Sequence, residues 1–269
     1  MPPPIITLTT DFGSRDGYVG AMKGVLLRRG PCTVVDIAHD IPRGDVAHAA
    51  WVVATSTRYF PAGTLHVVVV DPGVGSARRG VVVRDEAQYY VGPDNGSFAY
   101  LEADAVHTIE NEDLLARDVS NTFHGRDVFA PIAAYLAGEL TMGGEIRERT
   151  LANVGRRGDA LVGLPWGERS RGEGRIVHID HFGNLISDLP AEEVLDHDAI
   201  QTVVLGISIA GQHVPLVRTY SDVAPNQLLA YIGSAGTVEI AVRDGRADRM
   251  LAVPRGTPVT PAEPSGPFR

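Results

Sequence analysis

The sequence of 269 residues contains a single cysteine, Cys32, and no apolar run of the ~18 residues that a membrane-spanning helix needs. One cysteine cannot form an intrachain disulfide or, by itself, a thiolate metal cluster, so we expect a packed thiol. The N-terminal segment also lacks the basic and apolar regions of a signal peptide. These absences predict a cytoplasmic protein that does not contact a membrane.

Runs of lysine or arginine are missing as well, and the formal net charge is −9. A chain of this kind cannot neutralise a row of phosphates, so nucleic acid is not an expected partner. What the sequence does contain is an ordinary globular composition, with 44% hydrophobic and 21% charged residues. That is enough material for one large domain or two smaller ones.

The first part of the chain alternates between predicted strands and helices. Residues 5–10 are rich in β-branched side chains and predict a strand that ends before Asp11. The apolar spacing of residues 17–29 predicts a helix. The pattern returns in strands at 33–37, 64–70, 80–84 and 88–91 and in helices at 44–59 and 128–138. Nearly continuous apolar strands are typical of sheets covered on both faces. We therefore predict an α/β domain over residues 1–165, with a mostly parallel central sheet flanked by helices.

The rest of the chain has a different pattern. Alternating apolar segments are separated by Gly, Pro and Asn and show little helical spacing, at 175–180, 202–209, 228–232 and 237–242. They predict a small all-β domain over residues 172–253. The Gly- and charge-rich residues 155–172 are typical of a linker, and the Pro-rich tail 254–269 is expected to be poorly ordered.

Polar residues at the ends of apolar strands are candidates for a site, because ligands bind to open α/β sheets where strands end. Asp11 ends the first strand, Asp71 ends the most apolar strand, and His124 stands just before a helix. Taken singly, each is more typical of a turn or a helix cap, whereas the three together favour a site. The glycines at 73 and 75 suggest a dinucleotide fingerprint, but Arg78 stands where its third glycine belongs, so that motif is absent.

A metal site is another alternative, since imidazole and carboxylate groups are common ligands. His39, Asp40, His178, Asp180 and His181 supply such groups when added to Asp11 and Asp71, but their spacing matches neither a helical HExxH nor a comparable motif. The alternatives for them are solvated loop residues or groups that contact a substrate. We therefore expect no metal.

Several strings along the chain occur together, at 9–13 (TTDFG), 71–79 (DPGVGSARR), 92–96 (GPDNG), 123–131 (FHGRDVFAP), 179–184 (IDHFGN) and 233–241 (GSAGTVEIA). In this combination they resemble the S-adenosyl-L-methionine (SAM) hydrolases, also called SAM hydroxide adenosyltransferases, which are relatives of the fluorinase and chlorinase. The similarity runs from about residue 5 to residue 253. It implies hydrolysis of SAM to adenosine and L-methionine, with SAM as the substrate and no separate cofactor. It also implies a barrel-like C-terminal β domain and a homotrimer with active sites between subunits.

The resemblance also implies roles for individual residues. By this similarity Asp11 binds the ribose hydroxyls, and Asp71, Arg78 and His124 act on the water that attacks the ribose C5′ atom. Substrate contacts are implied for residues of both domains: Phe123, Gly125, Asp180, Phe182, Asn184, Ser234, Glu239 and Val242. The alternative for Phe182 is a core position. The halogenases carry an aromatic residue in the stretch corresponding to 41–45, where this chain has none.

These residue types suit the implied reaction. The sulfonium of SAM departs as a neutral thioether, so no acid is needed to protonate the leaving group. Water must become nucleophilic, and a positive Arg78 beside it favours hydroxide character while Asp71 or His124 takes the proton. Which of these two is the base is open at the level of the sequence.

Two other functions are alternatives to hydrolysis. A halide (chloride) adenosyltransferase would use the same fold with a pocket that lacks a base, and this chain also lacks the long insertion typical of the fluorinase. A non-catalytic SAM- or adenosine-binding protein would keep Asp11, Phe182 and Asn184 but would need no group that handles a nucleophile.

Overall fold

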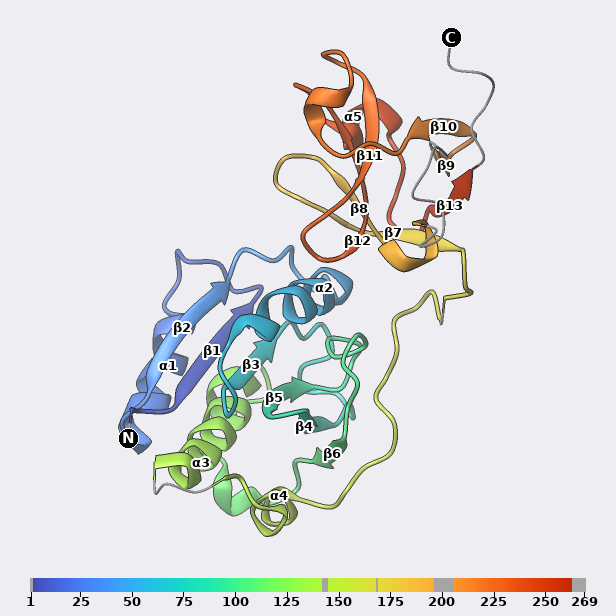
Figure 1. Ribbon diagram of the computed structural model, residues 1–269. Coiled ribbons are helices and arrows are strands. Elements are labelled where there is room, and N and C mark those ends of the chain that lie inside the picture. Colours follow the sequence, from blue (N-terminus) through green and yellow to red (C-terminus); the bar gives the residue numbers. More distant parts are fainter. Residues whose placement is uncertain (1, 142–144, 168, 196–205, 263–269) are drawn as a thin grey trace. The chain divides into compact units, whose positions relative to one another are not determined.

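The computed structural model describes residues 2–141, 145–167, 169–195 and 206–262. The chain divides into two compact units, Met1–Pro165 and Trp166–Arg269. Each unit has a hydrophobic core of its own, and Figure 1 labels helices and strands of both units.

The first unit is built on a six-stranded sheet, formed by β1 (Ile5–Thr10), β2 (Thr33–Ala38), β3 (Leu65–Val69), β4 (Gly80–Asp85), β5 (Gln88–Pro93) and β6 (Ala105–Thr108). Their order is β2-β1-β3-β5-β4-β6. β1, β2, β3 and β5 run parallel, whereas β4 pairs antiparallel with β5 and β6. The sheet is therefore mixed, where a mostly parallel one was predicted. Only two residues, Glu86 and Ala87, join β4 to β5, and so short a connection allows only an antiparallel pair.

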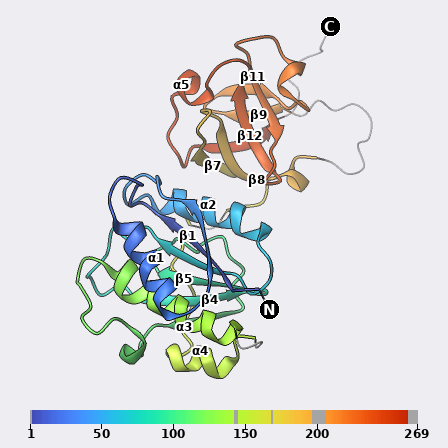
Figure 2. The same cartoon turned by 90° about the vertical axis from the view of Figure 1, so that its left-hand side faces the viewer.

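Helices cover both faces of this sheet (Figure 2). α1 (Tyr18–Arg29) and α3 (Ala130–Thr141) pack on one face, and α2 (Val46–Ser56) packs on the other through Val53. The shorter helical elements are α4 (Glu148–Val154) and two 3₁₀ turns, Thr57–Tyr59 and Glu112–Leu114. No helix in the described part of the chain is long and apolar enough to cross a membrane.

Most predicted elements of the first unit are present within two residues of the expected positions. The helix predicted at 128–138 differs, because the helical path begins earlier with a π-helical turn, Gly125–Phe129, and continues into α3. π-helical turns are rare and often occur at functional sites. β6 and α4 were not predicted, since four and seven residues are too few for a clear period in the sequence.

The second unit contains a seven-stranded antiparallel sheet in the order β10-β9-β13-β7-β8-β12-β11. The two outer strands approach each other, and Val217 N–H donates to the Ala230 carbonyl at 2.8 Å, so the sheet nearly closes into a barrel. The strands are β7 (Gly174–Ile179), β8 (Leu185–Pro190), β9 (Gly206–Ile209), β10 (Gln212–Pro215), β11 (Leu228–Ile232), β12 (Thr237–Val242) and β13 (Pro258–Ala262). 3₁₀ turns occupy Ala191–Glu193 and Tyr220–Asp222.

Two expectations for this unit are wrong. A short helix, α5 (Ala247–Leu251), lies in the domain that was predicted to be all-β. The tail expected to be poorly ordered from residue 254 forms β13, which pairs with β7 and β9. Val259 is fully buried in the core and stabilises this strand despite the prolines beside it. Residues 202–205 of the predicted strand 202–209, and the end of the tail, lie outside the described residues.

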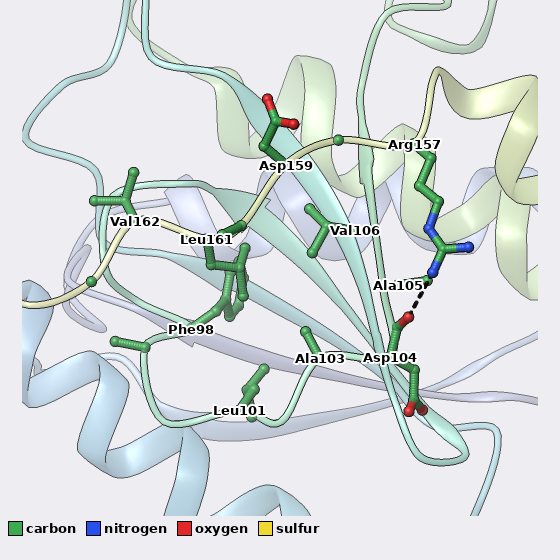
Figure 3. Close-up of a pocket in the computed structure, with 14 residues that line it drawn as sticks. Phe98, Leu101, Ala103, Asp104, Ala105, Val106, Arg157, Asp159, Leu161 and Val162 are labelled. Carbon is green, nitrogen blue, oxygen red and sulfur yellow. Dashed lines mark hydrogen bonds between the residues drawn. The ribbon is translucent and has the colours of Figure 1, made fainter. Parts of the chain in front are cut away.

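Residues 155–163, predicted as part of a linker, are attached to the first unit. Arg79 forms an ion pair with the buried Asp94 and donates to the Ala160 carbonyl at 2.6 Å. Asp94 Oδ1 in turn accepts a hydrogen bond from Val162 N–H at 2.8 Å. Figure 3 shows this segment passing over the side chains of Phe98 and Val106. The attachment was hidden in the sequence because it joins residues far apart along the chain.

His66 is a fully buried polar residue of β3. Gln88 uses its amide N–H groups on the carbonyls of Thr57 and Phe60, so its Oε1 atom accepts from His66 Nε2 at 3.0 Å. His66 Nδ1 then accepts from the Thr7 hydroxyl at 2.8 Å. Every polar atom of the ring is satisfied in the neutral form, and burial lowers the pKa of His66 to about 4.

Acidification should therefore destabilise the protein through His66. The unfolded chain takes up a proton on this ring near its ordinary pKa of 6.5, whereas the folded chain does so only near 4, so stability is lost as the pH falls through this window. Between about pH 7 and about pH 4, the stability advantage over His66→Gln should shrink by about 3 kcal/mol. Urea unfolding of both proteins measures this, and an advantage that stays constant with pH would contradict it.

Candidate active site

Two acidic residues follow adjacent strands of the first sheet. β1 and β3 pair in parallel with Thr10 opposite Val69, so Asp11 and Asp71 emerge at the same edge. Asp11 Oδ2 accepts a hydrogen bond from Gly44 N–H at 2.8 Å. A side chain at Gly44 would contact Pro72, so the loop around Gly44 touches the turns after both strands.

The loop after Asp71 folds back onto the segment that carries His124. Gly75 has a φ of 77°, and a Cβ atom there would lie 2.6 Å from the carbonyl oxygen of Asn121. Only glycine fits so close an approach with this backbone conformation. The turn brings Arg78 between Asp71 and His124.

Arg78 forms hydrogen bonds with both of these residues. Its Nε donates to the two carboxylate oxygens of Asp71 at 3.0 and 2.9 Å, and its Nη2 donates to Asp71 Oδ2 and, at 2.7 Å, to His124 Nδ1. The side chains of Arg78 and Asp71 are only 13% and 4% exposed. We call Asp71, Arg78 and His124 the Arg78 cluster; the fold connects all three through the guanidinium.

The contact with Arg78 also determines where His124 carries its proton. A guanidinium can only donate, so Nδ1 is the acceptor and the neutral ring holds its proton on Nε2. Burial lowers the pKa of His124, and the Arg78 cation lowers it further. His124 is therefore neutral near pH 7 and presents an N–H donor at Nε2.

Phe123 and Gly125 flank His124 and fix its position. The Phe123 ring packs edge-on against Phe12 and Tyr18, with centroids 5.8 and 5.4 Å apart. Gly125 is buried, and a Cβ atom there would lie 3.1 Å from the sulfur of Met22. A larger residue at 125 would push the π-helical turn away from α1.

His39 and its hydrogen-bond partners support the turn that carries Asp11. His39 Nδ1 lies 2.9 Å from the hydroxyl of Thr10, and His39 Nε2 lies 3.0 Å from Asp36 Oδ1. The His39 carbonyl also accepts from Gly13 N–H at 2.8 Å. These contacts hold the turn that carries Asp11. The position of His39 directly after a strand made it a candidate in the sequence, as a metal ligand or as a loop or substrate-contacting residue, but its contacts with Thr10 and Asp36 were not predicted.

In the second unit, the turn between β7 and β8 carries three of the predicted residues. Asp180 accepts two hydrogen bonds from Asn184, from its backbone N–H at 2.8 Å and from its side-chain amide at 2.9 Å. Phe182 lies at the tip of the turn and is 71% exposed, so the alternative of a core position is wrong. Its ring contacts the His181 ring edge-on, with centroids 5.6 Å apart, and an aromatic ring exposed to this extent can stack on a flat ligand.

Glu239 of β12 is buried and connects to this turn through two tyrosines. Tyr231 donates to Glu239 Oε2 at 2.5 Å, the hydroxyls of Tyr231 and Tyr220 lie 2.8 Å apart, and the Asn184 amide donates to the Tyr220 hydroxyl at 3.2 Å. Burial raises the pKa of Glu239 and also that of Tyr231. Sequence reasoning missed both tyrosines. The available signal for Tyr231 was a hydroxyl in the otherwise apolar strand β11.

The last two predicted residues of this unit differ in exposure. Ser234 lies exposed in the turn between β11 and β12. Val242 is 3% exposed and packs in the core of the unit. Its side chain is therefore not available to a ligand.

The metal alternative and the cavity shown in Figure 3 are both separate from the Arg78 cluster. Among the described residues, no group of three or more His, Cys, Asp or Glu side chains could hold a metal ion. The cavity, about 420 Å³, lies between residues 98–106 and 157–163, where Arg157 donates to the Asp104 carbonyl at 3.0 Å. It contains none of the predicted site residues.

Both parts of the chain match models of known protein families. A model of the SAM hydroxide adenosyltransferase N-terminal domain matches residues 6–144, and a model of the corresponding C-terminal domain matches residues 174–260. The chain belongs to the SAM hydroxide adenosyltransferase family. The Arg78 cluster lies within the N-terminal family domain, and the network from Asp180 to Glu239 lies within the C-terminal one.

Relatives in this family are similar over nearly their whole length. The (R)-S-adenosyl-L-methionine hydrolase of Salinispora tropica is 39% identical, over 95% of this chain and 96% of the relative. That of Thermus thermophilus is 37% identical, over 93% and 96%. The fluorinase of an Actinoplanes species is 26% identical, over 88% and 90%. A solved structure of an uncharacterized conserved protein from Thermotoga maritima is 31% identical with a TM-score of 0.82, and the match covers 96% of this chain and 100% of that chain.

Proposed function

We propose that this chain hydrolyses SAM to adenosine and L-methionine, by attack of an activated water on the ribose C5′ atom. The relatives that carry the name (R)-S-adenosyl-L-methionine hydrolase support this assignment by their identity and coverage. The observation in the structure that carries it is the Arg78 cluster, which joins a cation, a carboxylate and a neutral imidazole at the edge of the sheet where Asp11 also emerges.

The substrate itself supplies the leaving group. When the new C5′–O bond forms, the C5′–S bond breaks and its electron pair moves to sulfur, which turns the sulfonium into the neutral thioether of methionine. No proton has to reach the sulfur. The protein therefore needs groups that position the ribose and activate water, and alignment of oxygen, carbon and sulfur contributes much of the rate.

The Arg78 cluster suits the activation of water. Arg78 places a positive charge that stabilises hydroxide character as the proton leaves. His124 presents Nε2–H, which suits an orienting donor toward the water oxygen, because its Nδ1 atom is already occupied by Arg78. Asp71 is then the acceptor of the water proton, through a carboxylate that Arg78 holds in place. Asp11, at the same edge, is the acceptor for the ribose hydroxyls.

The residues of the second unit suit the two ends of SAM. The exposed ring of Phe182 offers a stacking surface for the adenine, and Asp180 and Ser234 offer polar groups for the amino acid end. In this proposal Asn184 contacts the substrate, and Glu239 acts through Tyr231 and Tyr220, to which it is connected by hydrogen bonds. We further propose a homotrimer in which each active site combines the first unit of one subunit with the second unit of the next.

Hydrolysis in oxygen-18 water should label the 5′ hydroxyl of adenosine and leave methionine unlabelled, because the broken bond joins carbon to sulfur. Mass spectrometry of both products measures this. Label in methionine would exclude attack at C5′. A parallel reaction in concentrated chloride should still give adenosine, whereas a dominant 5′-chloro product would show halide transfer instead. SAM that binds but stays intact after prolonged incubation would show a binding protein.

Substitutions in the Arg78 cluster should lower turnover far more than substrate affinity. Asp71→Asn, Arg78→Met and His124→Ala each remove a charge or contact that acts on the water, so kcat should fall by roughly 10²- to 10⁴-fold. Arg78→Lys should also be slow, because an ammonium keeps the charge but cannot reproduce the fork between Asp71 and His124.

Two other variants complete this comparison. Asp11→Ala should mainly raise KM, by roughly 10- to 100-fold, because it removes a charged acceptor for the ribose. Arg149→Met, on the exposed face of α4, is the matched control for Arg78→Met and should be unchanged. Near-normal turnover of both Asp71→Asn and His124→Ala would show that the chemistry occurs elsewhere.

A shared active site should be visible by complementation. Asp71→Ala damages the first unit and Asn184→Ala the second, so each variant alone should be nearly inactive. Subunits of both variants, mixed and reassembled, should recover about one quarter of the wild-type activity, since that share of the sites pairs two intact halves. Light scattering should show a trimeric mass. Failure of the mixed trimer to recover activity would place each site within one chain.

A further inference from the structure

A cavity of about 450 Å³ lies in the first unit against α1 and the beginning of α3. Its wall includes Arg28 and Arg29 of α1, Arg117 from the loop 115–117, and Arg126 of the π-helical turn. Apolar residues Val25, Leu115 and Pro131 complete much of the lining. We call it the arginine cavity; it is of a size that commonly holds small ligands.

The arginine cavity carries an excess of positive charge in a chain whose net charge is −9. Its one acidic residue, Asp127, is paired with Arg126 through two hydrogen bonds of 2.6 and 2.8 Å. Arg28, Arg29 and Arg117 have no carboxylate partner among the described residues. The last turn of α1 accounts for the presence of Arg28 and Arg29, since cations favour a helix C-terminus, but it does not account for Arg117.

Two of these arginines are held in position without a ligand. Arg29 Nη2 donates to the Leu115 carbonyl at 3.4 Å, which places it beside the loop that carries Arg117. Arg126 is fixed by Asp127 and by the Phe123 ring, whose centroid lies 4.8 Å from the guanidinium carbon. Prepositioned donors lose less side-chain freedom on binding, so this part of the wall costs little to order.

We propose that the arginine cavity binds a small anion with two or more negative charges, on phosphate or carboxylate groups. Guanidinium groups present paired donors that match both kinds of oxyanion. The unpaired charges of Arg28, Arg29 and Arg117 supply the attraction, and the apolar part of the lining contacts the carbon skeleton of an organic anion. The site contains no member of the Arg78 cluster and does not depend on the proposed hydrolysis.

The arginine cavity is connected to the segment that carries His124. Ala116 N–H donates to the Asp127 carbonyl at 2.9 Å, and Ser120 N–H donates to Asp127 Oδ2 at the same distance. The loop that carries Arg117 is therefore bonded to Asp127, which lies three residues after His124 in the segment that carries this histidine. An anion bound by Arg117 and Arg126 contacts two segments that Asp127 ties together.

Calorimetric titration with inorganic pyrophosphate and with citrate, at constant ionic strength adjusted with sodium chloride, tests this site. The wild type should bind at least one of the two saturably, and the double variant Arg28→Gln/Arg117→Gln should bind roughly 100-fold more weakly, about tenfold for each charged contact removed. The control is Arg147→Gln/Arg149→Gln, which removes the same charge from two exposed arginines at α4 and should bind as the wild type does.

The results with the two anions and the two double variants distinguish a phosphate site, a carboxylate site and a general response to net charge. Binding of pyrophosphate alone identifies a phosphate site, and binding of citrate alone identifies a carboxylate site. Equal weakening in both double variants would show a response to net charge and would overturn the proposal, as would the absence of saturable heat with either anion. Circular dichroism of each variant verifies that it is folded. All titrations are carried out without SAM, so the result is independent of the proposed activity.

Discussion

The Arg78 guanidinium holds the candidate site of the first unit together. It bonds to Asp71 after β3 and to His124 before α3, so one side chain joins two segments that are about fifty residues apart. Arg78 and Asp71 are buried together, so removal of either side chain would leave the other charge buried and unpaired, which would destabilise the folded protein. The same contact fixes the proton of His124 on Nε2. Electrostatics, protonation and geometry in this site therefore depend on one residue.

Close backbone packing makes that contact possible. Gly75 lets the loop after Asp71 reach the carbonyl of Asn121, and Gly125 lets the π-helical turn pack on Met22 of α1. A side chain at either position would separate the segments that Arg78 connects. The parallel pairing of β1 with β3 adds Asp11 to the same edge. Rigid elements thus place the polar groups, and the loops only complete the arrangement.

The second unit holds a carboxylate in the interior of a small β structure by means of hydrogen bonds. Glu239 is buried, and its charge is stabilised by the hydroxyl of Tyr231, which is linked through Tyr220 to Asn184. The chain of hydrogen bonds extends from the core to the turn that exposes Phe182. A substitution at Glu239 should therefore change the orientation of the Asn184 amide in the exposed turn, since each hydroxyl in the chain orients the next.

The sequence by itself determined the α/β character of residues 1–165, the strand ends at Asp11 and Asp71, and the family motifs, because strand periods and turn residues are local properties. It did not determine the antiparallel part of the first sheet, the strand β13 in the Pro-rich tail, or the attachment of residues 155–163 through Asp94. It also missed Tyr220 and Tyr231, and it did not determine the contacts of His39 with Thr10 and Asp36. Each of these depends on contacts between residues distant in the sequence. Only the tertiary structure decides such contacts, because burial and hydrogen bonding are properties of the packed chain.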